Sequence, residues 1–263
     1  MKLTLKVVNA AGIVLAQSNS GDEAFLVYRA AYSEGDSIVV ETSQPGHILL
    51  SFDAGIQPAL VFLAETSFTM PVPFGAKQKT YAPQAFLGDL HRISARRAAA
   101  EEVSARRNLA LNPFDDHANS SLFPHASANV ETRGEAVFAA RNAIDGEKAN
   151  TDHGFWPYTS WGINRDPAAA LTVNFGRPVL VDQLAIYLRA DFPHDAWWDK
   201  ACVTFSDGYT TSLALVKTGA AQLFEIEPRT VEWVTLHDLK KAEDPSPFPA
   251  LTQIEVWGVD AAT

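Results

Sequence analysis

The chain has 263 residues, 47% of them hydrophobic and 20% charged, a balance typical of folded globular proteins. Its formal net charge of −10 argues against the basic face that nucleic-acid binding requires, so we expect no nucleic-acid partner. The single cysteine, Cys202, excludes an intramolecular disulfide, and the sequence has no apolar run of about 18 residues that could span a membrane.

The first segment, residues 2–9, alternates polar and apolar side chains, which is the period of a β-strand. Asn9 and Gly12 interrupt the apolar stretch near the N-terminus, so we expect no secretory leader and a cytoplasmic protein. Further short apolar runs, each bounded by Gly, Pro, Asp or Ser, predict a small β-sandwich domain over residues 1–82. These runs lie at residues 12–17, 23–32, 36–42, 47–53, 59–64 and 67–72.

The composition changes in residues 83–107, where Ala, Arg, Glu and Leu dominate. Glu102 precedes Arg106 by four residues, the spacing of a supportive ion pair on a helix. The segment therefore predicts a helical connector between two domains. Its arginines are interpreted as a solvated face balanced by Glu101 and Glu102, and not as a site for an anionic partner.

Residues 108–263 are again rich in strand-like runs and long loops. They show neither the alternation of helices and strands of a parallel sheet nor a glycine-rich phosphate loop. The predicted fold is therefore all-β, with two β-sandwich domains joined by the helical connector. The second domain has predicted strands at residues 171–175, 179–188, 201–206, 210–215, 222–226, 231–239 and 252–259.

Four of the six tryptophans lie between Phe155 and Trp198, close to polar and charged residues. Aromatic rings can cover the C–H face of a pyranose, while charged groups hold its hydroxyls or a uronate carboxylate. The alternative is that each tryptophan is a core residue. The candidate ligand-binding residues are Trp156, Tyr158, Trp161, Arg189, Asp191, His194, Trp197 and Trp198.

Six short motifs occur in order in the second domain: residues 108–113, 141–146, Trp161, 170–182, 203–208 and 252–258. In this order and spacing they resemble the discoidin domain, also called the coagulation factor five/eight type C or galactose-binding-like domain. The resemblance covers about 155 of the 263 residues, and the first half resembles no family we can name. It implies an eight-stranded jelly roll that binds ligands, often galactose-type sugars, through loops at one end.

The resemblance also implies a structural calcium site. Asp145 stands at the family's liganding aspartate, Glu147 and Asn150 follow, and Asn142 offers a carbonyl. The departure is Gln253, because the family usually has a glutamate at this position, and an amide oxygen brings no charge. The alternative is that Asp145 only caps its turn.

Two classes of function follow from these residues. The first is a carbohydrate-binding protein, whose partner is a sugar ligand. The alternative is a sugar-acting enzyme or enzyme subunit, of hydrolase or lyase type, in which Asp191, His194 and Asp195 supply acid and base groups. Self-association into a homo-oligomer through the connector is a third, structural role.

Overall fold

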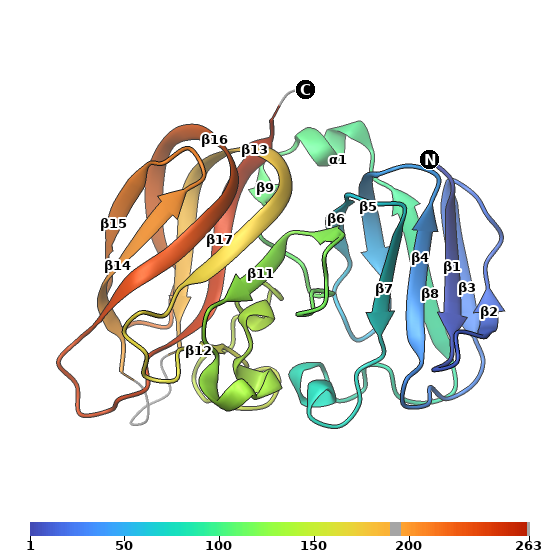
Figure 1. The fold of residues 1–263 in the computed structure, drawn as a ribbon, viewed down its shortest axis with the longest axis horizontal. Helices are drawn as coiled ribbons and strands as arrows, with labels where there is room; N and C mark the ends of the chain where they lie inside the picture. Colours follow the sequence, from blue (N-terminus) through green and yellow to red (C-terminus); the bar gives the residue numbers. More distant parts are fainter. Residues whose placement is uncertain (190–195, 262–263) are drawn as a thin grey trace.

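The computed structural model describes residues 1–189 and 196–261, which form two β-sandwiches lying side by side (Figure 1). The two chain termini lie toward the same end of the molecule, and short helical turns gather at the opposite end (Figure 1). None of the described helices is both long enough and apolar enough to cross a membrane.

The N-terminal sandwich consists of two antiparallel sheets that enclose one hydrophobic core. Side chains alternate between buried and exposed along strands such as β3, so each sheet turns one face inward. The strands predicted in residues 2–72 are confirmed. One sheet has the order β2 (Val14–Gln17), β1 (Leu3–Val8), β4 (Ser37–Thr42) and β7 (Ser67–Pro71). The other has the order β10 (Leu122–Phe123), β6 (Ala59–Leu63), β5 (Gly46–Ser51), β8 (His91–Arg97) and β3 (Glu23–Tyr28).

The prediction of a helical connector is wrong. Residues 91–97 form β8, which lies between β5 and β3 in the N-terminal sandwich, and the helix α1 covers Ala100–Ser104 only. The segment has the alternating burial of a strand, although its composition is typical of a helix. Ile93 and Ala95 are buried, whereas Arg92 is exposed. Burial of this alternating face outweighs the helix propensity of Ala and Arg.

The C-terminal sandwich is built around β13 (Leu171–Leu188), which pairs with β16 (Gln222–Lys241) along most of its length. The first part of β13 also pairs with β11 (His125–Ala128), and the second part with β17 (Ala250–Asp260). The register breaks between these parts, beside Gly176, whose φ of 66° few other residues adopt. The remaining strands are β9 (Arg107–Asn108), β12 (Trp161–Gly162), β14 (Trp198–Phe205) and β15 (Thr210–Ala214).

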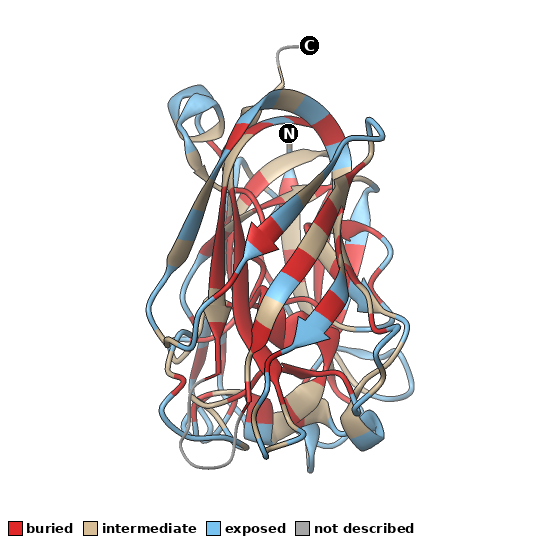
Figure 2. Ribbon diagram, turned by 90° about the vertical axis from the view of Figure 1, so that its left-hand side faces the viewer, coloured by how far each residue is buried: buried red, intermediate tan, exposed pale blue. Residues whose placement is uncertain are grey.

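Figure 2 shows the alternation of buried and exposed residues on these strands. The all-β prediction is confirmed. Four 3-10 turns add to the strands at the end away from the termini: η1 (Lys77–Thr80), η2 (Thr132–Gly134), η3 (Ala136–Phe138) and η4 (Ala140–Ala143).

The segment between the two sandwiches contributes to both cores. Leu109 and Ala126 pack in the C-terminal core, whereas Phe114 and Leu122 pack in the N-terminal core. Because this one segment places side chains in both cores, it links the two sandwiches.

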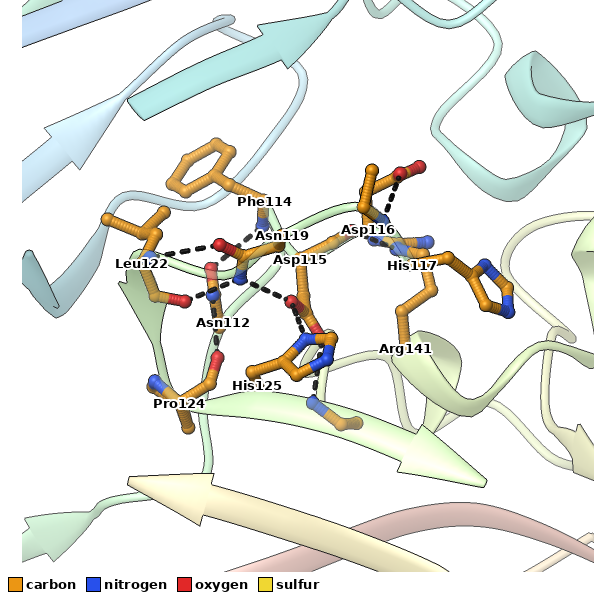
Figure 3. Close-up of polar contacts among 12 residues, drawn as sticks. Asn112, Phe114, Asp115, Asp116, His117, Asn119, Leu122, Pro124, His125 and Arg141 are labelled. Atoms are coloured by element: carbon orange, nitrogen blue, oxygen red, sulfur yellow. Dashed lines mark hydrogen bonds and ion pairs between the residues drawn. The ribbon is translucent and has the colours of Figure 1, made fainter. Parts of the chain in front are cut away.

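A buried arginine reinforces this junction (Figure 3). Arg141 donates from Nε to the carbonyl of Asp115 and from Nη2 to the carbonyl of Pro113, both at 2.9 Å. Its Nη1 reaches Thr80 Oγ1 of the N-terminal half at 3.3 Å, and its guanidinium carbon lies 4.7 Å from the ring centre of Tyr81. The cation therefore contacts both halves of the molecule.

The Asp115 side chain organises the other side of the junction and is fully buried (Figure 3). It accepts hydrogen bonds from Asn119 Nδ2 at 2.7 Å and from the Ala126 amide at 2.8 Å. His125 Nδ1 lies 2.8 Å from the same carboxylate, and this hydrogen bond raises the pKa of His125 above its ordinary value of 6.5.

This contact makes stability depend on pH. Because the pKa of His125 is raised on folding, its contribution is fully present below about pH 6.5 and disappears as pH rises through the raised pKa. We expect the free energy of unfolding to fall over that window in the wild type. In His125→Gln, which is neutral throughout, the dependence should be weaker in urea titrations at successive pH values.

His117→Gln is the matched control, because His117 owes its raised pKa to Glu131 and lies outside the Asp115 contact. It should retain the part of the pH dependence that belongs to His125. Equal slopes for the wild type and His125→Gln would contradict this account of the junction.

Candidate functional site

A cavity of about 470 Å³ opens at the end of the C-terminal sandwich away from the chain termini, and we call it the loop-end cavity. Three neighbouring strands meet there, since β17 lies between β12 and β13 in the sheet. Gly162 pairs with Ala250, and the Arg189 amide donates to the Ala250 carbonyl at 3.1 Å. The described lining residues are Thr132, Arg133, Phe138, His153, Gly162, Ile163, Asn164, Arg165, Arg189, Pro247, Phe248, Pro249 and Ala250.

Gly162 lets one wall of this cavity come close to the strands. A Cβ at this position would lie 2.5 Å from Thr132 Oγ1 and 3.3 Å from the Cβ of Phe138. A larger residue would therefore push η2 and η3 away from the sheet. The lack of a side chain at Gly162 is what allows Phe138 to face the cavity.

Two phenylalanine rings, each covered by guanidinium groups, give the cavity its aromatic surface. The guanidinium carbons of Arg133 and Arg189 each lie 5.7 Å from the ring centre of Phe138. That of Arg165 lies 4.8 Å from the ring centre of Phe248. These distances fit cation–π contacts, which hold the charged groups against the rings.

Arg189 is 6% exposed and lies at the inner side of the cavity. Its Nη1 is 3.4 Å from Ser160 Oγ. Removing a cation from water is costly, so this position has to be stabilised by the groups around it. Arg189 is a sequence-predicted binding residue that the structure places in the cavity wall.

The tryptophans that were predicted to bind a ligand lie in different surroundings. Trp161 and Trp198 are fully buried in the C-terminal core, where their ring centres are 6.5 Å apart, so neither ring presents a surface to a ligand. Trp156 packs against the N-terminal core, and its amide donates to the Lys79 carbonyl at 2.9 Å. Trp197 is half-buried beside the C-terminal core, with Lys217 Nζ 5.1 Å from its ring centre.

Tyr158 is also half-buried, and its amide closes a turn on the Phe155 carbonyl at 2.9 Å. Trp156 therefore contributes to the contact between the sandwiches, and of this loop only His153 belongs to the described lining of the loop-end cavity. The remaining candidates, Asp191, His194 and Asp195, lie outside the described residues.

The cavity residues that sequence reasoning missed come from η2, η3 and two loops: Thr132, Phe138, Arg165 and Phe248. One sequence signal marks Phe248, because prolines on both sides restrict its backbone. The motif-poor segment around Arg165 has no comparable signal.

The predicted calcium ligands come together around an amide. Gln253 is 1% exposed, and its Nε2 donates to Asp145 Oδ1 at 2.7 Å and to the carbonyl of Asn142. Its Oε1 accepts from the Gly146 amide at 3.0 Å, which fixes the orientation of the side chain. The Glu147 amide donates to the same Asp145 oxygen at 2.9 Å.

This arrangement does not fit a calcium ion. Calcium takes about six to eight oxygen ligands, whereas two of the expected ones, Asn142 O and Asp145 Oδ1, already converge on an N–H donor. Asn150 uses its amide to bind the carbonyls of Leu188 and Gly219. Among the described residues no group of three or more His, Cys, Asp and Glu is arranged to hold a metal.

Burial raises the pKa of Asp145 to about 7, even though the charge of Arg141 lowers it. An amide donor from Gln253 suits such a carboxyl in either protonation state, because the second Asp145 oxygen remains available for the proton. Calcium stays a prediction of the resemblance that this set of donors does not support.

Comparison with known proteins gives structural matches only: no family model and no curated protein matches the chain. The chitosan-binding module 1 from a Paenibacillus sp. IK-5 chitosanase/glucanase matches with a TM-score of 0.38 and 22% identity, over 59% of this chain and 100% of the module. The family 32 carbohydrate-binding module of C. perfringens NanJ, in complex with galactose, matches with 0.39 and 21%, over 50% and 91%.

The lectin domain of lectinolysin, complexed with Lewis B antigen, matches with a TM-score of 0.44 and 18% identity, over 59% of this chain and 98% of the domain. These three solved modules are thus similar to the chain over about half of its length. At these scores the function has to be argued from the residues of the chain itself.

The Gln253 contacts lead to a test of metal dependence. We expect neither calcium nor EDTA to shift the melting temperature of the wild type. In Gln253→Glu a second carboxylate faces Asp145 without the amide donor, so the melting temperature should fall by several degrees and recover with millimolar calcium.

Gln253→Leu is the control, because it removes the donor and adds no charge. It should be destabilised by about 1–3 kcal/mol through unpaired buried oxygens, with no recovery in calcium. A wild type that loses stability in EDTA would contradict the assignment of the Gln253 amide to this position.

Proposed function

We propose that the protein binds carbohydrate in the loop-end cavity. The observation that carries the proposal is the combination of the Phe138 and Phe248 rings with guanidinium groups in one concave site. A pyranose has C–H groups on its faces and hydroxyls at its edge. It therefore complements an aromatic wall beside hydrogen-bond donors.

The dimensions and stiffness of the site support this proposal. A cavity of about 470 Å³ lies within the range of roughly 300–1,000 Å³ that small-ligand sites occupy. Its walls are tied to the sheet through the pairing of Gly162 with Ala250 and the hydrogen bond from Arg189 to Ala250. A site built on paired strands loses little conformational entropy when a ligand binds.

The enzyme alternative depends on Asp191, His194 and Asp195, which lie outside the described residues. Binding is the better-supported conclusion because its contacts lie in the described cavity. The cytoplasmic location and self-association remain predictions from the sequence.

The test is ligand binding by Phe248→Ala. A glycan panel with the wild type identifies a saccharide, and isothermal calorimetry then compares the variants with it. Removal of the ring should weaken binding at least about tenfold, equivalent to about 1.4 kcal/mol, with little loss of stability because Phe248 is only half-buried.

Phe25→Ala is the matched control, since Phe25 is 62% exposed on β3 of the N-terminal sandwich. It should bind like the wild type. Chromatography of the same samples checks that the sugar is unchanged. Unaltered affinity in Phe248→Ala would place the sugar elsewhere, and a saccharide product would favour the enzyme.

A further inference from the structure

Among the described residues, the lining of the loop-end cavity has a charge opposite to the net charge of the protein. The chain carries a formal net charge of −10, yet the described lining includes Arg133, Arg165, Arg189 and His153 and no aspartate or glutamate. A second cavity of the same volume, between the sandwiches, contains Asp116 and Glu135 beside its lysines. Within the described part of the chain, the positive lining therefore distinguishes the loop-end cavity from this second cavity.

The three arginines differ in how their charge is balanced. Arg133 forms an ion pair with Glu135, at 2.6 Å from Nε to Oε1. Arg189 is buried, and its contacts include Ser160 and Phe138. Arg165 is exposed, and within residues 1–189 and 196–261 its guanidinium forms neither a hydrogen bond nor an ion pair. Its contact there is the Phe248 ring.

The backbone at Arg165 is held in an unfavourable conformation. Asn164 and Arg165 have φ of 49° and 62°, in the left-handed region that arginine rarely adopts. The turn is closed by the Asp166 amide on the Ile163 carbonyl at 2.9 Å and anchored by the Asn164 amide on Thr132 Oγ1 at 2.9 Å. These contacts place Arg165 at the cavity instead of leaving it to an ordinary loop.

We propose that the cavity selects an acidic saccharide, whose carboxylate or sulfate pairs with Arg165 while its ring lies against Phe248. The inference rests on the proposed carbohydrate binding and adds the charge of the ligand. A guanidinium has a planar set of N–H donors that matches two oxygens of such a group. Its guanidinium carbon lies over the Phe248 ring, and its N–H donors have no partner among the described residues, so they can pair with the ligand.

The test uses ligand pairs that differ in charge and share their ring structure. Trigalacturonate is compared with its methyl ester, and lactose 6′-sulfate with lactose, by isothermal calorimetry on the wild type. We expect at least one acid to bind about tenfold more tightly than its neutral counterpart. Arg165→Gln should bring the two members of the pair to similar affinity and change the neutral ligand little.

Two further variants distinguish pairing of the ligand with Arg165 from a general effect of positive charge on the protein. Arg29→Gln removes one positive charge from an exposed position in the N-terminal sandwich and should keep the preference for acid. Arg165→Lys keeps the charge without the planar donors and should retain part of the preference for acid. Circular dichroism and melting curves establish that each variant folds.

The outcomes distinguish selection for acidic sugars from carbohydrate binding itself. Equal binding of acid and neutral partner in both pairs would overturn the selection for acidic sugars and leave carbohydrate binding intact. A preference for acid that survives in Arg165→Gln would overturn the role of Arg165. No binding of any of the four ligands would overturn the charge inference, and silence on the wider glycan panel would overturn the proposed function as well.

Discussion

Burial of the Arg141 guanidinium is the constraint on which the arrangement of the two sandwiches depends. Removing a cation from water costs several kcal/mol unless acceptors and nearby charges offset the loss. Its acceptors are the carbonyls of Pro113 and Asp115 in the connecting segment, the side-chain oxygen of the neighbouring Asn142, and the hydroxyl of Thr80 in the N-terminal half. Separating the sandwiches would remove the Thr80 and Tyr81 contacts and leave the charge poorly compensated, so the two halves are energetically coupled.

Burial of Arg141 also affects the loop-end cavity, because a short stretch of chain connects the two. Arg141 lies in η4, three residues after Phe138, whose ring forms part of the cavity. On the other side of Arg141, the Gln253 amide binds Asn142 and Asp145. A neutral donor therefore holds this turn, and buried hydrogen bonds of Arg141 and Gln253 hold the chain that follows Phe138.

Much of the fold could be predicted because strand period is a local property of sequence. The alternation along residues 2–72 is visible without tertiary information, and so are the two halves of β13. The region around β8 misled the prediction because Ala and Arg favour helices locally, while pairing with β3 and β5 decides the outcome. The tryptophans misled the prediction of the binding site for another reason. Their clustering along the chain does not indicate which rings face solvent, and Trp161 and Trp198 are buried in the core.

The cavity was harder to anticipate because its wall is assembled from segments far apart in sequence. Arg189 could be named from its position after a predicted strand, whereas Phe138, Arg165 and Phe248 meet it only through the pairing of β12, β17 and β13. The left-handed backbone at Arg165 is a tertiary outcome that its residue type alone opposes. Strain of this kind persists only where surrounding contacts enforce it, which is why an unusual backbone is informative about the site.

The contrast between global and local charge explains how such a cavity can discriminate. At physiological ionic strength, fields between exposed charges decay over about 8 Å, so the net charge of −10 acts weakly on a ligand already inside the cavity. Arg165 and Arg189 line the cavity and lie against the low-polarity faces of Phe248 and Phe138. Discrimination therefore depends on the few groups that touch the ligand, and a negatively charged surface around them is compatible with recognition of an acidic sugar.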